Sequence, residues 1–141
     1  MELVKRNIHM DSQKCMASIQ TTLEKDSNIS DSKPDAVKLI MDKGNVVIEE
    51  IRVTDDHAGV KGKLQFRILY LAEGTKADVA VMEGEIPFEE QIYMSGVACN
   101  DTVEVTPEIE DLTTTMINSR KFSVQSVISL KAVCSEIRDE E

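Results

Sequence analysis

Two long segments of the chain, residues 61–72 and 120–133, alternate between apolar and polar side chains. In the first segment the apolar positions are Leu64, Phe66, Ile68 and Tyr70. In the second segment they are Phe122, Val124, Ile128, Leu130 and Ala132. A period of two residues is typical of a β-strand that has one face on a core and the other toward water. The pattern therefore predicts two long strands.

Shorter segments rich in β-branched residues and bounded by turn residues predict further strands at residues 7–24, 46–53, 79–88 and 102–112. Pro87 indicates that its strand ends there or lies at an edge, because proline cannot donate a hydrogen bond to a ladder. For the same reason Pro107 indicates a bulge or an edge strand. The predicted fold class is mainly β, an antiparallel β-sandwich or an open barrel. A strand, a polar connector and a long strand occur at 48–72 and again at 109–133, which indicates either an internal duplication or two similar hairpins.

One short helix is expected near residues 34–43. Pro34 stands near its first turn, and Gly44 is placed to end it. The apolar positions Ala36, Val37, Ile40 and Met41 have the i, i+3, i+4 spacing of one helical face. A helix this short needs tertiary support, so it is expected to lie against the sheet.

The length of 141 residues fits a single domain. We expect residues 1–29 to form one or more N-terminal strands and a linker that packs on the domain. Residues 30–135 form the β domain, and residues 136–141 form a solvated acidic tail.

The formal net charge of −10 repels phosphate backbones and anionic lipid headgroups, so nucleic acid is not an expected ligand. The N-terminus has no secretory signal pattern, and no apolar run is long enough to insert into a membrane. Cys15, Cys99 and Cys134 are widely spaced and carry no CxxC motif, so three reduced thiols in a cytoplasmic protein are expected. The alternative of a zinc site lacks a ligand pair at metal spacing.

The nearest approach to a catalytic pattern is the pair Glu83 and Glu85, which share one face of a predicted strand. A glycosidase pair needs an environment that separates the two pKa values, and a solvated strand face is the simpler interpretation. His57 follows two aspartates in a polar loop that could loosely hold a cation. The chain has no nucleophile elbow, P-loop or dinucleotide motif. The sequence therefore predicts a protein that is not an enzyme, with no cofactor and no metal.

Several segments together resemble the SPOCS domain of clostridial sporulation proteins, over about residues 30–135. The matching segments are residues 32–40, 46–53, 60–71, 85–88, 101–105 and 118–128. Gly96, between residues 85–88 and 101–105, also matches. Members of this family commonly carry several such domains followed by a LysM module. The chain contains no LysM segment, so whether it is a fragment of a longer LysM-containing protein stays open.

The resemblance implies a non-enzymatic interaction or scaffold domain that acts in spore envelope (coat) assembly on the mother-cell side of the forespore. Its expected partners are other sporulation or coat proteins, with self-association as a further possibility. Ile86, Pro87 and Phe88 are candidate interaction residues at the end of a strand, with core packing as the alternative for Phe88. A carbohydrate- or peptidoglycan-binding module is the alternative function, which the low aromatic content argues against.

Overall fold

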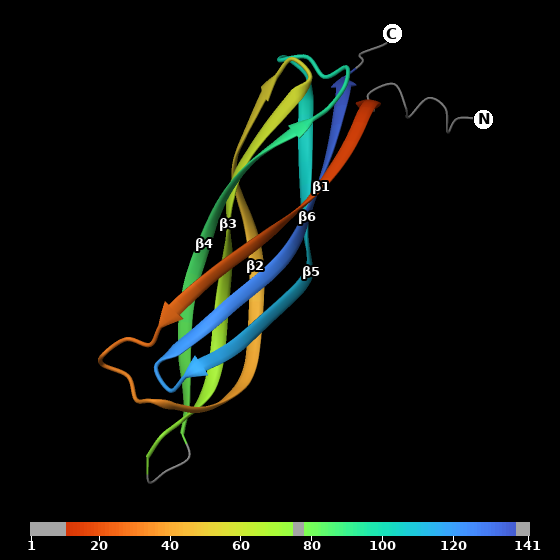
Figure 1. Ribbon diagram of the computed structural model, residues 1–141. Coiled ribbons are helices and arrows are strands. Elements are labelled where there is room, and N and C mark those ends of the chain that lie inside the picture. Colours follow the sequence, from red (N-terminus) through yellow and green to blue (C-terminus); the bar gives the residue numbers. More distant parts are fainter. Residues whose placement is uncertain (1–10, 75–77, 138–141) are drawn as a thin grey trace, which may run out of the picture.

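The computed structural model describes residues 11–74 and 78–137, and this part of the chain forms six strands and no helix (Figure 1). The strands are β1 (Asp11–Asn28), β2 (Ala36–Thr54), β3 (His57–Ala72), β4 (Val79–Tyr93), β5 (Thr102–Asn118) and β6 (Lys121–Ile137). Each has 15 to 19 residues. At about 3.3 Å per residue a strand of this length spans roughly 50–60 Å, which explains the elongated shape.

The six strands form two three-stranded antiparallel sheets that face each other. Sheet A has the order β1-β6-β5, and sheet B has the order β2-β3-β4. Strand β2 lies beside β5 and β1 lies beside β4, without a ladder across either seam. This arrangement confirms the predicted antiparallel β fold with a sandwich-like architecture.

The core lies between the inward faces of the two central strands, β3 and β6. The inward positions predicted from alternation in both long segments are confirmed as buried. Tyr70 and Phe122 meet at a ring-centroid distance of 5.6 Å across the two sheets. The ring of Phe66 lies over Gly84 on β4, where an added Cβ would come within 2.4 Å of a ring atom. Four of the five Phe and Tyr side chains are buried, and they pack in an interior that is otherwise mostly aliphatic.

The expected helix near residues 34–43 is wrong, because strand β2 begins at Ala36 and runs through this segment. The ladder with β3 has register shifts between Ala36 and Lys38 and between Leu39 and Met41. Each bulge adds one residue, so the inward positions Ala36, Leu39 and Asp42 are spaced by three residues instead of two. Two successive bulges therefore imitate a helical period, and the supposed apolar helix face is mostly exposed.

For both prolines the edge-strand alternative is confirmed. Pro87 lies in β4 and Pro107 lies in β5, and each of these strands is at an edge of its sheet. A missing N–H is tolerated at an edge position that faces away from the neighbouring strand.

The N-terminal strand β1 is an integral part of sheet A, in continuous register with β6 from Cys15 to Asn28. A connector of residues 29–35 then carries the chain from sheet A to sheet B. Because β6 is the central strand of sheet A, sheet A requires segments from both ends of the described chain.

The two ends of the sandwich are closed by different groups. We call one the Arg120 end, formed by residues 29–36, 72–74, 78 and 118–121. The other is the disulfide end, formed by Cys15, Cys134, residues 54–57 and residues 94–101. Main-chain bonds link the two sheets at the Arg120 end, including Ala36 N to Ser119 O at 2.8 Å. At the disulfide end the β2–β3 turn is bonded to the loop between β4 and β5.

Candidate interaction surfaces

The three candidate residues at positions 86–88 lie in the middle part of β4 and point in two directions. Ile86 and Phe88 are buried in the core, with 7% and 6% of their surface exposed, which confirms the core-packing alternative for Phe88. Pro87 is exposed on the outer face. In this arrangement only Pro87 is accessible to a partner, and the predicted contact at these residues stays a prediction.

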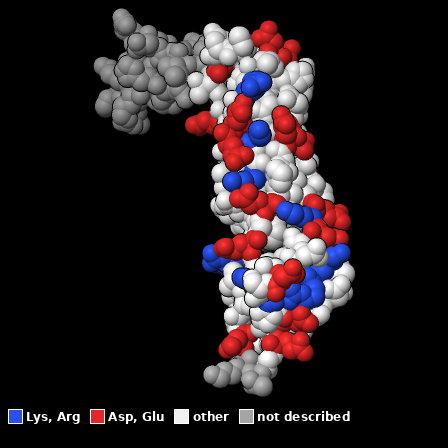
Figure 2. Space-filling view, turned by 90° about the vertical axis from the view of Figure 1, so that its left-hand side faces the viewer, with Lys and Arg blue, Asp and Glu red and all other residues white. Residues whose placement is uncertain are grey.

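The free edge of β4 is covered by side chains from the opposite sheet and its connector. Lys25 Nζ donates to the main-chain oxygen of Glu85 at 3.0 Å, and Lys33 Nζ donates to that of Val81. Figure 2 views the side on which β4 lies in Figure 1, and it shows basic and acidic groups interspersed there. Lysines on an exposed edge are a known protection against strand pairing. The β4 edge is therefore blocked against addition of a further strand.

The acidic pair Glu83 and Glu85 shares the outer face of β4, as the sequence predicts, and each carboxylate has a basic partner on β3. Arg67 contacts Glu83 Oε2 through Nε at 3.0 Å and Nη2 at 2.7 Å. Lys63 Nζ lies 3.2 Å from Glu85 Oε2 and 3.5 Å from Glu49 Oε2. The hydrogen bond to Glu85 is the main cause that raises the pKa of Lys63 above its ordinary value. This geometry is that of a solvated face with cross-strand ion pairs.

His57 lies at the disulfide end, ten positions along β3 from the residue that pairs with Glu83, a distance of about 33 Å. Its ring meets Tyr93 edge-on at 5.5 Å, and its Nδ1 lies 3.3 Å from the main-chain oxygen of Asp55. The fold therefore does not bring His57 to the acidic pair.

Within residues 11–74 and 78–137, no group of three or more His, Cys, Asp or Glu side chains is arranged to hold a metal ion. In the same residues, no helix has the length and apolarity that crossing a membrane requires.

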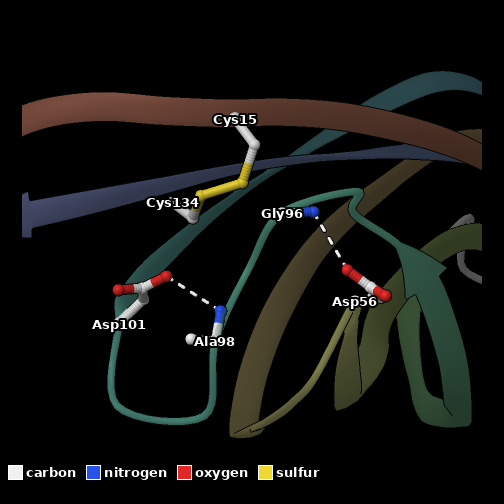
Figure 3. The surroundings of a disulfide bond; sticks show 6 residues. All are labelled: Cys15, Asp56, Gly96, Ala98, Asp101 and Cys134. Carbon is white, nitrogen blue, oxygen red and sulfur yellow. Dashed lines mark hydrogen bonds between the residues drawn. A yellow bond between two sulfur atoms is a disulfide. The ribbon is translucent and has the colours of Figure 1, made fainter.

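The expectation of three reduced thiols is wrong for two of them, because Cys15 and Cys134 form a disulfide (Figure 3). The two residues are direct partners in the β1–β6 ladder, with a Cα–Cα distance of 5.3 Å. They are 119 residues apart in sequence, so their spacing carried no signal of the pairing. Cys99 is a free, exposed thiol in the loop between β4 and β5.

The outer face of sheet B is hollowed where its polar and apolar parts meet. A concavity of about 560 Å³ is lined by main-chain and side-chain atoms of Lys43, Gly44, Asn45, Gln65, Phe66, Arg67, Glu83, Gly84 and Glu85. Its size lies within the range of ligand pockets, about 300–1,000 Å³, but it is open to solvent along the sheet. A convex protein surface fits such a hollow better than an enclosed small molecule does.

Sequence reasoning missed the apolar part of this outer face. In the runs at residues 68–72 and 79–82, the residues that point to one face of the strand and those that point to the other are all apolar. Inward positions account for one phase, and the other phase leaves Leu69, Leu71, Val79 and Val81 on the outer face. A run without polar residues was therefore a usable signal of a sheet that is apolar on both faces.

A family model described as SipL, SPOCS domain, matches residues 35–117, more than half of the chain. The match covers strands β2 to β4 and nearly all of β5. No curated protein matches the chain, and no solved structure does.

Proposed function

Because the chain belongs to the SipL SPOCS-domain family, we propose that it is a non-enzymatic interaction module in the assembly of the spore envelope, with a sporulation or coat protein as its partner. The family match supports a role in sporulation. The structural observation that supports binding is a group of exposed apolar side chains on one face and end of a chain with a net charge of −10. Monomeric soluble proteins rarely expose a large contiguous apolar patch unless it serves an interaction.

The test is site-specific photo-crosslinking in sporulating cells. A photoreactive residue at position 41 or 79, on the exposed apolar part of sheet B, is expected to capture a sporulation protein that mass spectrometry identifies. The same residue at position 16, on the outer face of sheet A, is the control because Met16 is similarly exposed. No sporulation-specific product at either apolar position would contradict the proposal.

We also propose that the chain acts in the mother-cell cytoplasm, at the surface of the forespore envelope. The Cys15–Cys134 bond makes this location directly testable, since disulfides rarely persist in a reducing cytosol. Thiol trapping in intact sporulating cells would measure the fraction of oxidised chain. A cytoplasmic site predicts mainly free thiols at these two positions, whereas a fully oxidised population would point to an oxidising compartment.

A carbohydrate- or peptidoglycan-binding role is the second candidate, and one observation favours it. Tyr93 is 61% exposed, while the other four aromatic side chains are buried, and it lies on the same outer face as Gln91. A tyrosine ring next to an amide is a small platform on which a sugar could stack. Titration with cell-wall fragments should then shift the backbone NMR signals of residues 91–93, and an unchanged spectrum would end this alternative.

A further inference from the structure

Strand β1 is held to the rest of the sandwich in different ways along its length. We call residues 15–19 its leading segment and residues 21–28 its trailing segment, and both are in continuous register with β6. Thr21 Oγ1 donates to Glu90 Oε2 and Lys25 Nζ donates to the main-chain oxygen of Glu85, each at 3.0 Å. Among the described residues, the hydrogen bonds from β1 to sheet B therefore come from the trailing segment.

Burial of apolar side chains follows the same division. Leu23 in the trailing segment is 7% exposed, and Ile29, just after the strand, is 3% exposed. The inward side chains of the leading segment are all half-buried, and two of them are small: Cys15, Ala17 and Ile19. Because hydrophobic stabilisation scales with the apolar area removed from water, packing holds the trailing segment more firmly than the leading one.

The disulfide lies at the end of the leading segment that is remote from the connector (Figure 3). Cys15 and Cys134 are ladder partners, and the register shifts between Gln13 and Cys15, just beyond the bond. The leading segment is thus fixed at one end by the trailing segment and at the other by a covalent bond. Without the bond it is a strand end held by its ladder and by partial burial, and such ends open at low cost.

The disulfide can be opened by a dithiol reductant. Cys134 is fully buried, whereas Cys15 is half-buried, so the thiolate of the reductant reaches the sulfur of Cys15 and Cys134 leaves as a thiolate. The second thiolate of the reductant then displaces Cys15 from the mixed disulfide. Two electrons pass to the protein, the reductant becomes a disulfide, and its two protons end on the two cysteines.

Opening of the leading segment changes the exposure of β6. Residues 130–134 of β6 pair with the leading segment on one side and with β5 on the other. Once the leading segment opens, this part of β6 keeps only its β5 neighbour and becomes a strand edge. The thiol of Cys134, which the closed strand buries completely, then becomes accessible.

We propose that the Cys15–Cys134 bond is a redox switch for the leading segment of β1. In the oxidised chain the segment is fixed on β6, and in the reduced chain it opens while the trailing segment and sheet B stay folded. The switch goes beyond the proposed function and does not depend on the identity of a partner.

The experiment is amide hydrogen exchange, followed by NMR, on the chain with Cys99→Ser, first oxidised and then reduced by a dithiol. The readout is the ratio of the protection factors of the trailing segment to those of the leading segment, which should rise at least tenfold on reduction. Global destabilisation lowers both factors together and leaves this ratio unchanged. Within residues 130–134 the amides that point to β1 should lose protection, while the alternate amides that point to β5 keep it.

Alkylation of a single thiol tests the same opening without a reductant. In the chain with Cys15→Ser and Cys99→Ser, Cys134 is the only thiol. The matched control is Ala58→Cys in a chain with all three natural cysteines replaced by serine, because Ala58 on β3 is as fully buried as Cys134. The thiol at position 134 should react at least ten times faster than the one at position 58.

A protection ratio that changes less than twofold, or equal alkylation rates at the two positions, would overturn the switch. A reduced chain that loses protection in all six strands would also overturn it, because the bond would then hold the whole fold. Each of these results leaves the crosslinking test of the proposed function unaffected, so the two proposals can fail separately.

Discussion

The two ends of this sandwich are both closed by specific bonds, but the bonds are of different kinds. At the Arg120 end a single guanidinium donates to four oxygens of the connector between the sheets. These are the main-chain oxygens of Ile29, Ser30 and Lys33 and Oδ1 of Asp35, at 2.7–3.1 Å. At the disulfide end a covalent bond joins β1 to β6, and Asp56 holds the loop between β4 and β5 by its main chain and its carboxylate.

The comparison shows how two sheets without a shared ladder stay together. Side chains fill the seams between β2 and β5 and between β1 and β4, but no ladder crosses them. The main-chain hydrogen bonds between the sheets therefore lie at the two ends. Along the β1–β4 seam, side chains supply the bonds, from Thr21 Oγ1 to Glu90 Oε2 and from Lys25 Nζ to Glu85 O. The disulfide joins strands of one sheet, whereas the Arg120 contacts tie the crossing connector directly, so the two ends should respond differently to the same kind of perturbation.

Reduction of the disulfide should have the largest effect. The bond closes a loop with a sequence separation of 119 residues, and chain entropy alone gives such a cross-link about 5 kcal/mol. We expect the free energy of unfolding in urea to fall by about that amount when a dithiol reduces the chain. A Cys99→Ser background keeps the free thiol from exchanging. A change below about 1 kcal/mol would show that this end is held by packing instead.

Loss of the guanidinium should rank second. Arg120→Met keeps much of the aliphatic stem but removes all four hydrogen bonds, and bonds from a charged donor contribute about 1.5–3 kcal/mol in favourable cases. Because the Arg120 side chain is 34% exposed, we expect a total loss of about 2–3 kcal/mol in chemical denaturation. Arg52→Met is the control, since the Arg52 side chain is 77% exposed and, among the described residues, pairs with Glu50. Equal losses of unfolding free energy in the two variants would show that Arg120 does not stabilise the connector between the sheets.

The turn at the disulfide end should have a smaller effect. Asp56 has a φ of 65°, and its Oδ1 accepts from Gly96 N at 3.0 Å. Asp56→Ala places a side chain without an acceptor in the left-handed region, and we expect a loss of about 1–2 kcal/mol. Asp56→Asn keeps an oxygen acceptor and tolerates this conformation, so it should cost much less. Thermal unfolding of the two variants side by side is the measurement.

The smallest of these effects should be a loss of folding stability at alkaline pH, which originates at the Arg120 end. Tyr70 is fully buried there, its hydroxyl donates to Pro34 O at 3.3 Å, and burial raises the pKa of Tyr70 above 10. The folded state therefore keeps this proton longer than the unfolded state does. Its contribution is fully present below pH 10 and is lost as the pH rises through the folded pKa.

Tyr70→Phe is the matched variant for this prediction. It should cost about 0.5 kcal/mol at neutral pH, since the hydroxyl bond is long. It should also flatten the fall in stability above pH 10. A wild-type and a variant curve that run parallel from pH 8 to 11 would show that Tyr70 titrates normally.

Much of the fold was predictable because alternation is a local property of the sequence. The inward residues of β3 and β6 were correct, since a long unbroken period of two leaves only one way to bury an apolar face. Pro87 and Pro107 located two edge strands for an equally local reason, their missing N–H groups. The strand predicted at residues 46–53 is part of β2, but the first part of β2, up to residue 43, was misassigned as a helix. Its bulges depend on the register against β3, which its own residues do not reveal.

Less of the interaction surface could be predicted. The sequence named Ile86, Pro87 and Phe88, but two of these are buried, and the exposed apolar group lies elsewhere on the same sheet. The apolar runs at 68–72 and 79–82 are visible in the sequence. Their alignment with Met41 into a face requires the ladders that join three strands.

By itself, then, the sequence determined the antiparallel β class, the central strands, the edge prolines and the family. Tertiary structure alone decided which cysteines meet, that Arg120 ties the crossing connector, and which apolar residues stay outside. The physical reason is distance along the chain. Periodicity, turns and proline act between near neighbours, whereas a disulfide across 119 residues, a side chain that spans two sheets and a row across three strands exist only once the sheets have formed.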